Sequence, residues 1–238
     1  ELSIRENIEQ GRVSRAGFSG PQSGISDHNR IVERHASPFG YLWASYDSAG
    51  DLGRQNFANF PLGPATLDAT NVKAFVHAGG EFIASLPNGL QVYMLATADG
   101  KRIDQGPQDI VRDPNQFSGS FDVVNAISCI GCHRHGLLRF TDTIRAQWID
   151  QADVAVAGRV LALYPPQAEL DALVTADRRR FLDALQLACG QLLLDTTAGS
   201  GSSQGRSIED FPEPVTATAR NYNRSLDLSD VARELGLP

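Results

Sequence analysis

Two cysteines and a histidine lie close together in residues 127–138, whose sequence is ISCIGCHRHGLL. The spacing is Cys129-x-x-Cys132-His133. On a helix, side chains three and four residues apart share one face, so all three groups would project together. Two thiols and an imidazole in this arrangement have three chemical uses: covalent attachment of a haem, ligation of zinc, or a redox-active dithiol. The alternative is that the spacing arises by chance.

The zinc and dithiol alternatives each lack a second signal in the chain. Zinc usually takes four ligands, and no second close pair of cysteines or histidines accompanies the first. A redox dithiol normally follows a strand in a βαβ pattern, which the sequence does not show. A haem has two vinyl groups that can each take one cysteine sulfur as a thioether, and the spacing holds the imidazole under the iron. Covalent haem attachment is therefore favoured.

The pentapeptide CIGCH resembles the attachment motif of the c-type cytochromes. The segments HNRIVERH, GGEFIASLPNGLQVYML, GPQDIVRDP and ISCIGCHRHG also resemble a group of uncharacterised exported bacterial proteins with one haem site, over roughly residues 25–190. The resemblance implies one covalent haem c, with thioethers at Cys129 and Cys132 and with His133 as the proximal iron ligand. It also implies a periplasmic or otherwise exported location.

The second axial ligand of such an iron is expected upstream of the motif. The small class I cytochromes c place a methionine ligand well downstream, but no methionine follows His133. His135 is too near His133 to reach the opposite side of the same iron. The upstream candidates are His28, His35, His77 and Met94. We rank His77 first, because the double glycine after it permits close approach, then Met94 and then His35. Core packing of Met94 and a hydrogen-bonded loop role for His77 remain open.

The bulk composition excludes some classes of function. The chain has 238 residues, a hydrophobic content of 42% and a net charge of −7. A nucleic-acid-binding protein would need a basic face, so nucleic acid is not expected as a partner. No run of eighteen apolar residues is present, so no membrane-spanning helix is expected. The third cysteine, Cys189, is expected to pack as a small hydrophobic residue in a helix.

Residues 81–104 predict β-hairpins. Asn88-Gly89 and Asp99-Gly100 each suit a tight turn. A two-residue turn at Asn88-Gly89 would pair Ile83 with Met94 and Phe82 with Leu95. Both faces of such a hairpin would be apolar and should be covered, and a flat apolar cofactor is one candidate cover. We therefore expect this hairpin to form one wall of a haem pocket.

The remaining segments divide at about residue 124. Residues 1–70 are rich in Gly, Ser, Pro and Asn and predict loops with short elements. After residue 124 the pattern is helical, and the prolines that follow Tyr164 should separate two helices. Thr175 is expected to cap a helix that ends at Gly190. Residues 196–207 predict a flexible linker, followed by a short C-terminal helix.

The predicted fold class is α+β, with a loop-rich part containing a small antiparallel β-meander (1–124), a helical haem-bearing part (125–195) and a linker with a helix (196–238). The two larger parts should share one core around the haem. The expected function is electron transfer with a redox partner protein. A redox or gas sensor and a haem enzyme of the peroxidase type are the alternatives, so catalysis is left open.

Overall fold

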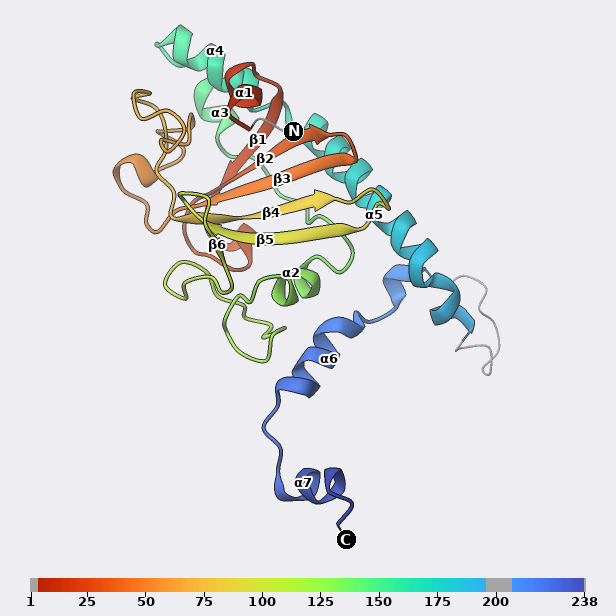
Figure 1. Cartoon of the computed structure of the whole chain (residues 1–238). Helices are drawn as coiled ribbons and strands as arrows, with labels where there is room; N and C mark the ends of the chain where they lie inside the picture. The colour runs from red at the N-terminus through yellow and green to blue at the C-terminus, as the bar shows by residue number, and fades with distance from the viewer. Residues whose placement is uncertain (1–3, 196–206, 238) are drawn as a thin grey trace.

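A six-stranded antiparallel sheet forms the centre of the computed structural model, which describes residues 4–195 and 207–237. The strands pair in chain order, so the sheet is a simple meander (Figure 1). They are β1 (Val13–Phe18), β2 (Arg30–Ser37), β3 (Gly40–Asp47), β4 (Gly79–Ser85), β5 (Gln91–Thr97) and β6 (Arg102–Ile103). Helices dominate the chain after the sheet, which confirms the predicted α+β class.

The helices lie mostly after residue 124. They are α1 (Ile4–Glu9), α2 (Ile127–Cys132), α3 (Arg145–Trp148), α4 (Val154–Leu163), α5 (Gln167–Asp195), α6 (Pro214–Asn223) and α7 (Leu228–Glu234), with 3-10 turns η1 (Gly20–Ser23), η2 (Gly53–Gln55) and η3 (Ile208–Asp210). None of the described helices is long and apolar enough to span a membrane.

Some predicted helix boundaries are confirmed and two are wrong. The break after Tyr164 separates α4 from α5, and α7 is the expected C-terminal helix. However, α5 runs without interruption through both residues, so Thr175 does not begin a helix and Gly190 does not end one. Residues 196–206 of the predicted 196–207 linker lie outside the described residues.

The register of the β4–β5 hairpin differs from the prediction by one residue. Gly89 takes φ +84°, and its amide donates to Leu86 O at 2.9 Å, while the Leu86 amide donates to Leu90 O at 2.8 Å. This is a three-residue loop with a left-handed glycine, not a two-residue turn. Phe82 therefore pairs with Met94 and Ile83 with Tyr93. Because side chains alternate along a strand, this shift exchanges the two faces of β5.

Side-chain alternation defines two faces of the sheet. The front face carries Trp43, Ile83 and Leu95, and the back face carries Ile31, Tyr46 and Met94. The back face packs on Ile144, Trp148 and Val160 from α3, α4 and the segment before them. Around the hairpin this face is only partly covered, since Met94 is half-buried and Val92 is 45% exposed. The prediction that both hairpin faces are covered therefore holds for the front face only.

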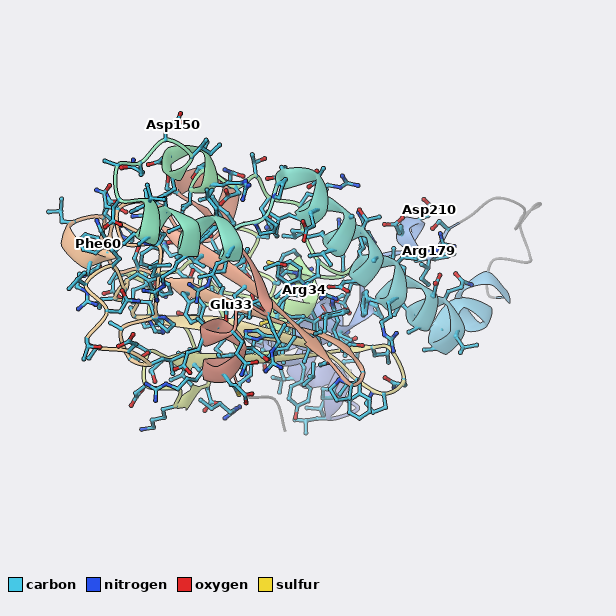
Figure 2. All side chains as sticks on the ribbon, turned by 90° about the horizontal axis from the view of Figure 1, so that it is seen from above. Glu33, Arg34, Phe60, Asp150, Arg179 and Asp210 are labelled. Carbon is cyan, nitrogen blue, oxygen red and sulfur yellow. The ribbon has the colours of Figure 1, made fainter. Side chains whose placement is uncertain are left out.

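The front face carries two clusters of buried side chains. One joins Trp43 and Ile83 to Leu137 and to Val174 of α5. The other joins Leu95, Val111 and Val123 to Cys129 of α2. Asp177 attaches α5 to the front face, because it accepts hydrogen bonds from Arg34 Nε at 2.7 Å and from Trp43 Nε1 at 2.8 Å. Arg34 is labelled in Figure 2. Residues from both sides of residue 124 thus share the same clusters.

Candidate functional site

Helix α2 is fixed to the sheet at its first turn. The Leu95 amide of β5 donates to Asn125 Oδ1 at 2.8 Å, which ties the segment before α2 to the sheet. Ser128 Oγ accepts from the Val124 amide at 3.0 Å and donates to Asp122 O at 3.3 Å. These bonds hold the two cysteines of α2 over the front face.

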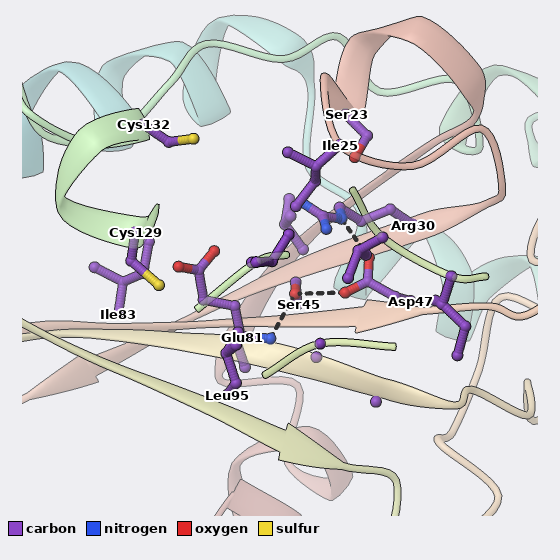
Figure 3. Close-up of a pocket in the computed structure, with 18 of the residues that line it drawn as sticks. Ser23, Ile25, Arg30, Ser45, Asp47, Glu81, Ile83, Leu95, Cys129 and Cys132 are labelled. Carbon is purple, nitrogen blue, oxygen red and sulfur yellow. Dashed lines mark hydrogen bonds and ion pairs between the residues drawn. The ribbon is translucent and has the colours of Figure 1, made fainter. Parts of the chain in front are cut away.

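Cys129, Cys132 and His133 line a single pocket between α2 and the front face of the sheet. Figure 3 shows both sulfur atoms on the helix above strands β3 and β4. The space between the walls is about 1330 Å³, counting the part that opens to solvent.

The walls of this pocket are mostly apolar. The sheet supplies Val32, Trp43, Ala44, Ile83, Leu95 and Ala96, and the surrounding loops supply Ile25, Ile110, Val111, Val123, Leu137 and Phe140. The predicted hairpins contribute directly, since residues of β4, β5 and β6 line the same pocket as the two cysteines. The hairpin region is therefore one wall of the pocket that holds the motif.

The two ring nitrogens of His133 have different surroundings. Nδ1 lies 3.3 Å from Gly136 O, where Gly136 takes φ +86°. Nε2 lies 3.6 Å from Oε2 of Glu81, which is within ion-pair distance but too long for a hydrogen bond. A proton on Nδ1 that is donated to the carbonyl would leave the Nε2 lone pair free to bind a metal.

The two motif cysteines are free thiols in a low-dielectric setting. Cys129 is buried and Cys132 half-buried. Burial, followed by the charges of Asp113 and Glu81, raises the pKa of Cys132 to about 12. Burial also raises the pKa of Cys129, with Glu81 adding to the effect. Both thiols are therefore neutral near pH 7, whereas redox-active dithiols have a lowered pKa.

Charged side chains occupy one part of the pocket floor. Arg30 forms an ion pair with Asp47, and Ser45 Oγ donates to the same carboxylate at 3.3 Å (Figure 3). The Glu81 amide donates to Ser45 Oγ at 2.8 Å. Burial alone would raise the pKa of Glu81, but His133, the Cys129 thiol and Arg30 hold it below its ordinary value. Glu81 is therefore a carboxylate in this pocket.

His77, the first-ranked distal candidate, does not line the pocket. Its neighbour Ala78 does, but the His77 ring packs on the back face, 5.0 Å from the Tyr46 ring and 5.9 Å from the Phe75 ring. Its Nδ1 is buried and has no hydrogen-bond partner among the described residues, and burial lowers its pKa to about 4. The structure places His77 away from His133.

The other candidates also lie elsewhere. Met94 is on the back face as a consequence of the hairpin register. His35 is fully buried on the same face, with Nε2 2.6 Å from Glu33 Oε1. His28 Nδ1 contacts Asp51 Oδ2 at 3.2 Å near the surface, and His135 is absent from the pocket lining. The structure thus unites Cys129, Cys132 and His133 but brings none of the upstream candidates to them.

Glu81 is the pocket residue that sequence reasoning missed. Its signal is the alternation Gly79-Glu81-Ile83 on β4, which puts a carboxylate on an otherwise apolar face. That signal is interpretable only when the register is known.

Comparison with known proteins adds no relative: a scan of protein families, a search of curated proteins and a search of solved structures each found no match.

Proposed function

We propose that this chain is a single-haem c-type cytochrome. Cys129 and Cys132 carry the haem as thioethers, and His133 is the proximal iron ligand. The observation that carries the proposal is the convergence of these three side chains on one pocket whose opposite wall is the front face of the sheet. In each thioether, the S–H of a cysteine adds across a vinyl double bond, with sulfur bonding one carbon and hydrogen the other.

The residues present fit a haem in three respects. The pocket is lined mainly by apolar side chains, as a porphyrin ring needs. Both thiols reach the pocket, which attachment at two vinyl groups requires. The Nδ1 of His133 faces the backbone carbonyl of Gly136, and a contact of this kind orients a metal-bound imidazole. When bound, the haem would supply one-electron redox chemistry.

The zinc and dithiol alternatives have less support. Within residues 4–195 and 207–237, no group of three or more His, Cys, Asp or Glu side chains is arranged to hold a metal ion. The strand before α2 belongs to an antiparallel meander, not to the βαβ unit that precedes a thioredoxin-like motif. Neither structural context for these two chemistries is present in the described part of the chain.

The proposed activity is electron transfer to a redox partner protein. Thioether attachment holds one cofactor permanently, as a shuttle between partners requires. Because such attachment normally takes place outside the cytoplasm, we also propose a periplasmic or otherwise exported location. The partner is expected to be a protein, since the net charge of −7 does not suit nucleic acid.

A second candidate function is binding of an exogenous ligand at the iron, as in a gas sensor or an enzyme of the peroxidase type. The observation that favours it is the absence of His77 and Met94 from the pocket lining. An iron without a strong second axial ligand from the protein can exchange ligands, which a pure electron carrier does not need.

Cysteine variants test haem attachment. The chain is expressed with the export and haem-attachment machinery of a bacterial host, and the purified protein is extracted with acidified acetone. We expect the colour to stay with the parent and with the control Cys189→Ser, whose cysteine does not line the pocket. The double variant Cys129→Ser/Cys132→Ser should lose it. Colour that is extracted equally from parent and double variant would reject covalent attachment.

A further inference from the structure

Strand β4 directs the Glu81 side chain toward the motif. Glu81 pairs with Leu95 across β4 and β5, so its side chain lies on the front face, under α2. Its side chain is 12% exposed, and Oε2 is 3.6 Å from Nε2 of His133. Figure 3 shows the carboxylate extending from the sheet toward α2, beside the sulfur atom of Cys129.

Among the residues that the structure describes, Glu81 has few partners. The nearby cation Arg30 already forms an ion pair with Asp47, so its charge is balanced. The contacts found for the Glu81 carboxylate are His133 and the thiol of Cys129. Its charge therefore depends mainly on the same residues that would hold the haem, with a smaller contribution from Arg30.

Haem attachment would withdraw both contacts. A thioether at Cys129 has no S–H left to donate. An imidazole that gives its Nε2 lone pair to iron has no Nε2 proton either, so it cannot act as a cation or donor toward the carboxylate. A buried carboxylate without a donor or a counter-charge is strongly disfavoured. A ferric iron held by His133 would supply the positive charge that the Glu81 carboxylate then lacks.

We propose that the Glu81 carboxylate is the sixth ligand of the ferric iron, opposite His133. This inference rests on the proposed haem site. With bonds of about 2.0–2.2 Å from a metal to imidazole nitrogen or carboxylate oxygen, as for zinc, two opposite ligands are roughly 4 Å apart. The 3.6 Å between His133 Nε2 and Glu81 Oε2 needs only a small adjustment to reach that separation.

With this ligand, the strength of the bond between Glu81 and the iron would depend on the redox state of the iron. A carboxylate is a hard, anionic ligand and suits the ferric ion better than the less charged ferrous ion. Reduction would weaken the bond to Glu81 and expose the iron to an external ligand such as carbon monoxide. The proposal therefore deepens the second candidate function, in which the iron exchanges ligands.

The test compares three single variants of the haem-loaded protein. Glu81→Gln keeps the shape of the side chain and removes its charge, while His77→Phe and Met94→Leu change the back face only. We expect Glu81→Gln to alter the ferric spectrum and to tighten binding of imidazole to ferric protein about tenfold or more, since imidazole no longer has to displace a carboxylate. The two back-face variants should match the parent.

A second variant, designed to add an iron ligand, keeps the test informative if Glu81→Gln does not fold. Glu81→His should place a second imidazole opposite His133 and give a low-spin spectrum in both redox states. An unchanged ferric spectrum and imidazole affinity in Glu81→Gln, together with no low-spin form in Glu81→His, would overturn the assignment. Intact mass of each variant shows whether haem is attached, so failure of the haem site is distinguished from failure of the Glu81 ligand.

Discussion

Glu81 and His133 face each other across the pocket, with Oε2 of the carboxylate 3.6 Å from Nε2 of the ring. The group opposite His133 is therefore a carboxylate, and not the histidine or methionine that the sequence led us to expect. His133 was identifiable because the motif Cys129-x-x-Cys132-His133 is local and specific. Glu81 was not, because long-range strand pairing, and not local sequence, decides which face of β4 lies under α2. At the scale of single residues, the sequence predicts those groups whose chemistry is encoded by spacing along one helix.

His77 should make folding stability depend on pH. Its folded-state pKa of about 4 lies below the ordinary value of about 6.5, because burial disfavours the charged ring. The unfolded chain therefore takes up the proton first as pH falls. The stabilisation is complete above about pH 6.5 and is lost between there and pH 4, by about 3 kcal/mol. Urea unfolding at pH 7 and pH 4.5 measures this loss.

The matched variant for this prediction is His77→Phe, which keeps an aromatic ring beside Tyr46 and Phe75. Other titrating groups affect parent and variant alike, so the difference between them isolates His77. A loss of stability that is as steep in His77→Phe as in the parent would show that this ring does not cause it.

The buried ion pair of Arg15 and Glu33 on the back face should contribute strongly to the free energy of unfolding. Arg15 Nε donates to Glu33 Oε2 at 2.6 Å, and both side chains are fully buried. Removing one partner leaves an uncompensated buried charge, so Arg15→Met should destabilise the fold by about 3–5 kcal/mol. The double variant Arg15→Met/Glu33→Gln should recover part of this loss in urea unfolding. A single variant within about 1 kcal/mol of the parent would contradict this prediction.

At the scale of elements, α2 depends on close packing at its one glycine. A Cβ at Gly131 would lie 2.3 Å from Cγ of Phe117, whose side chain cannot move away without a backbone shift. Gly131→Ala should therefore destabilise the protein by about 1–3 kcal/mol. The control is Gly158→Ala in α4, where nothing lies within 4 Å of the added Cβ. That change should stabilise by about 0.5–1 kcal/mol.

Thermal unfolding of the two alanine variants measures both effects. Opposite shifts of the melting temperature are expected, downward for Gly131→Ala and upward for Gly158→Ala. Two upward shifts would show that α2 does not pack against Phe117 as described.

The first three strands could not be predicted from the sequence pattern. In β1 and β2, the inward positions include Arg15, Glu33 and His35, so burial does not coincide with apolar residues. The usual alternation of apolar and polar side chains is therefore lost. The hairpins at 81–104 and the break after Tyr164 were predictable, because glycine and proline act locally there. The hairpin register was not, since Asn88-Gly89 suits loops of two or three residues.

For the whole molecule, the meander explains why a chain of 238 residues surrounds a single motif. The sheet gives the pocket a broad wall, while α2 and the loops on either side of it close its sides. Long-range arrangements of this kind could not be predicted from local patterns. The fold class and the three motif residues could be predicted, but the polar group that faces His133 could not.

The central claim is one haem bound covalently through Cys129 and Cys132, and the mass of the intact chain under denaturing conditions tests it most directly. The protein is produced in a host that attaches haem to exported proteins, and a visible spectrum and metal content are recorded on the same sample. We predict the mass of the chain plus one haem, with the iron content to match. The mass of the bare chain, no visible absorbance and bound zinc would contradict the claim.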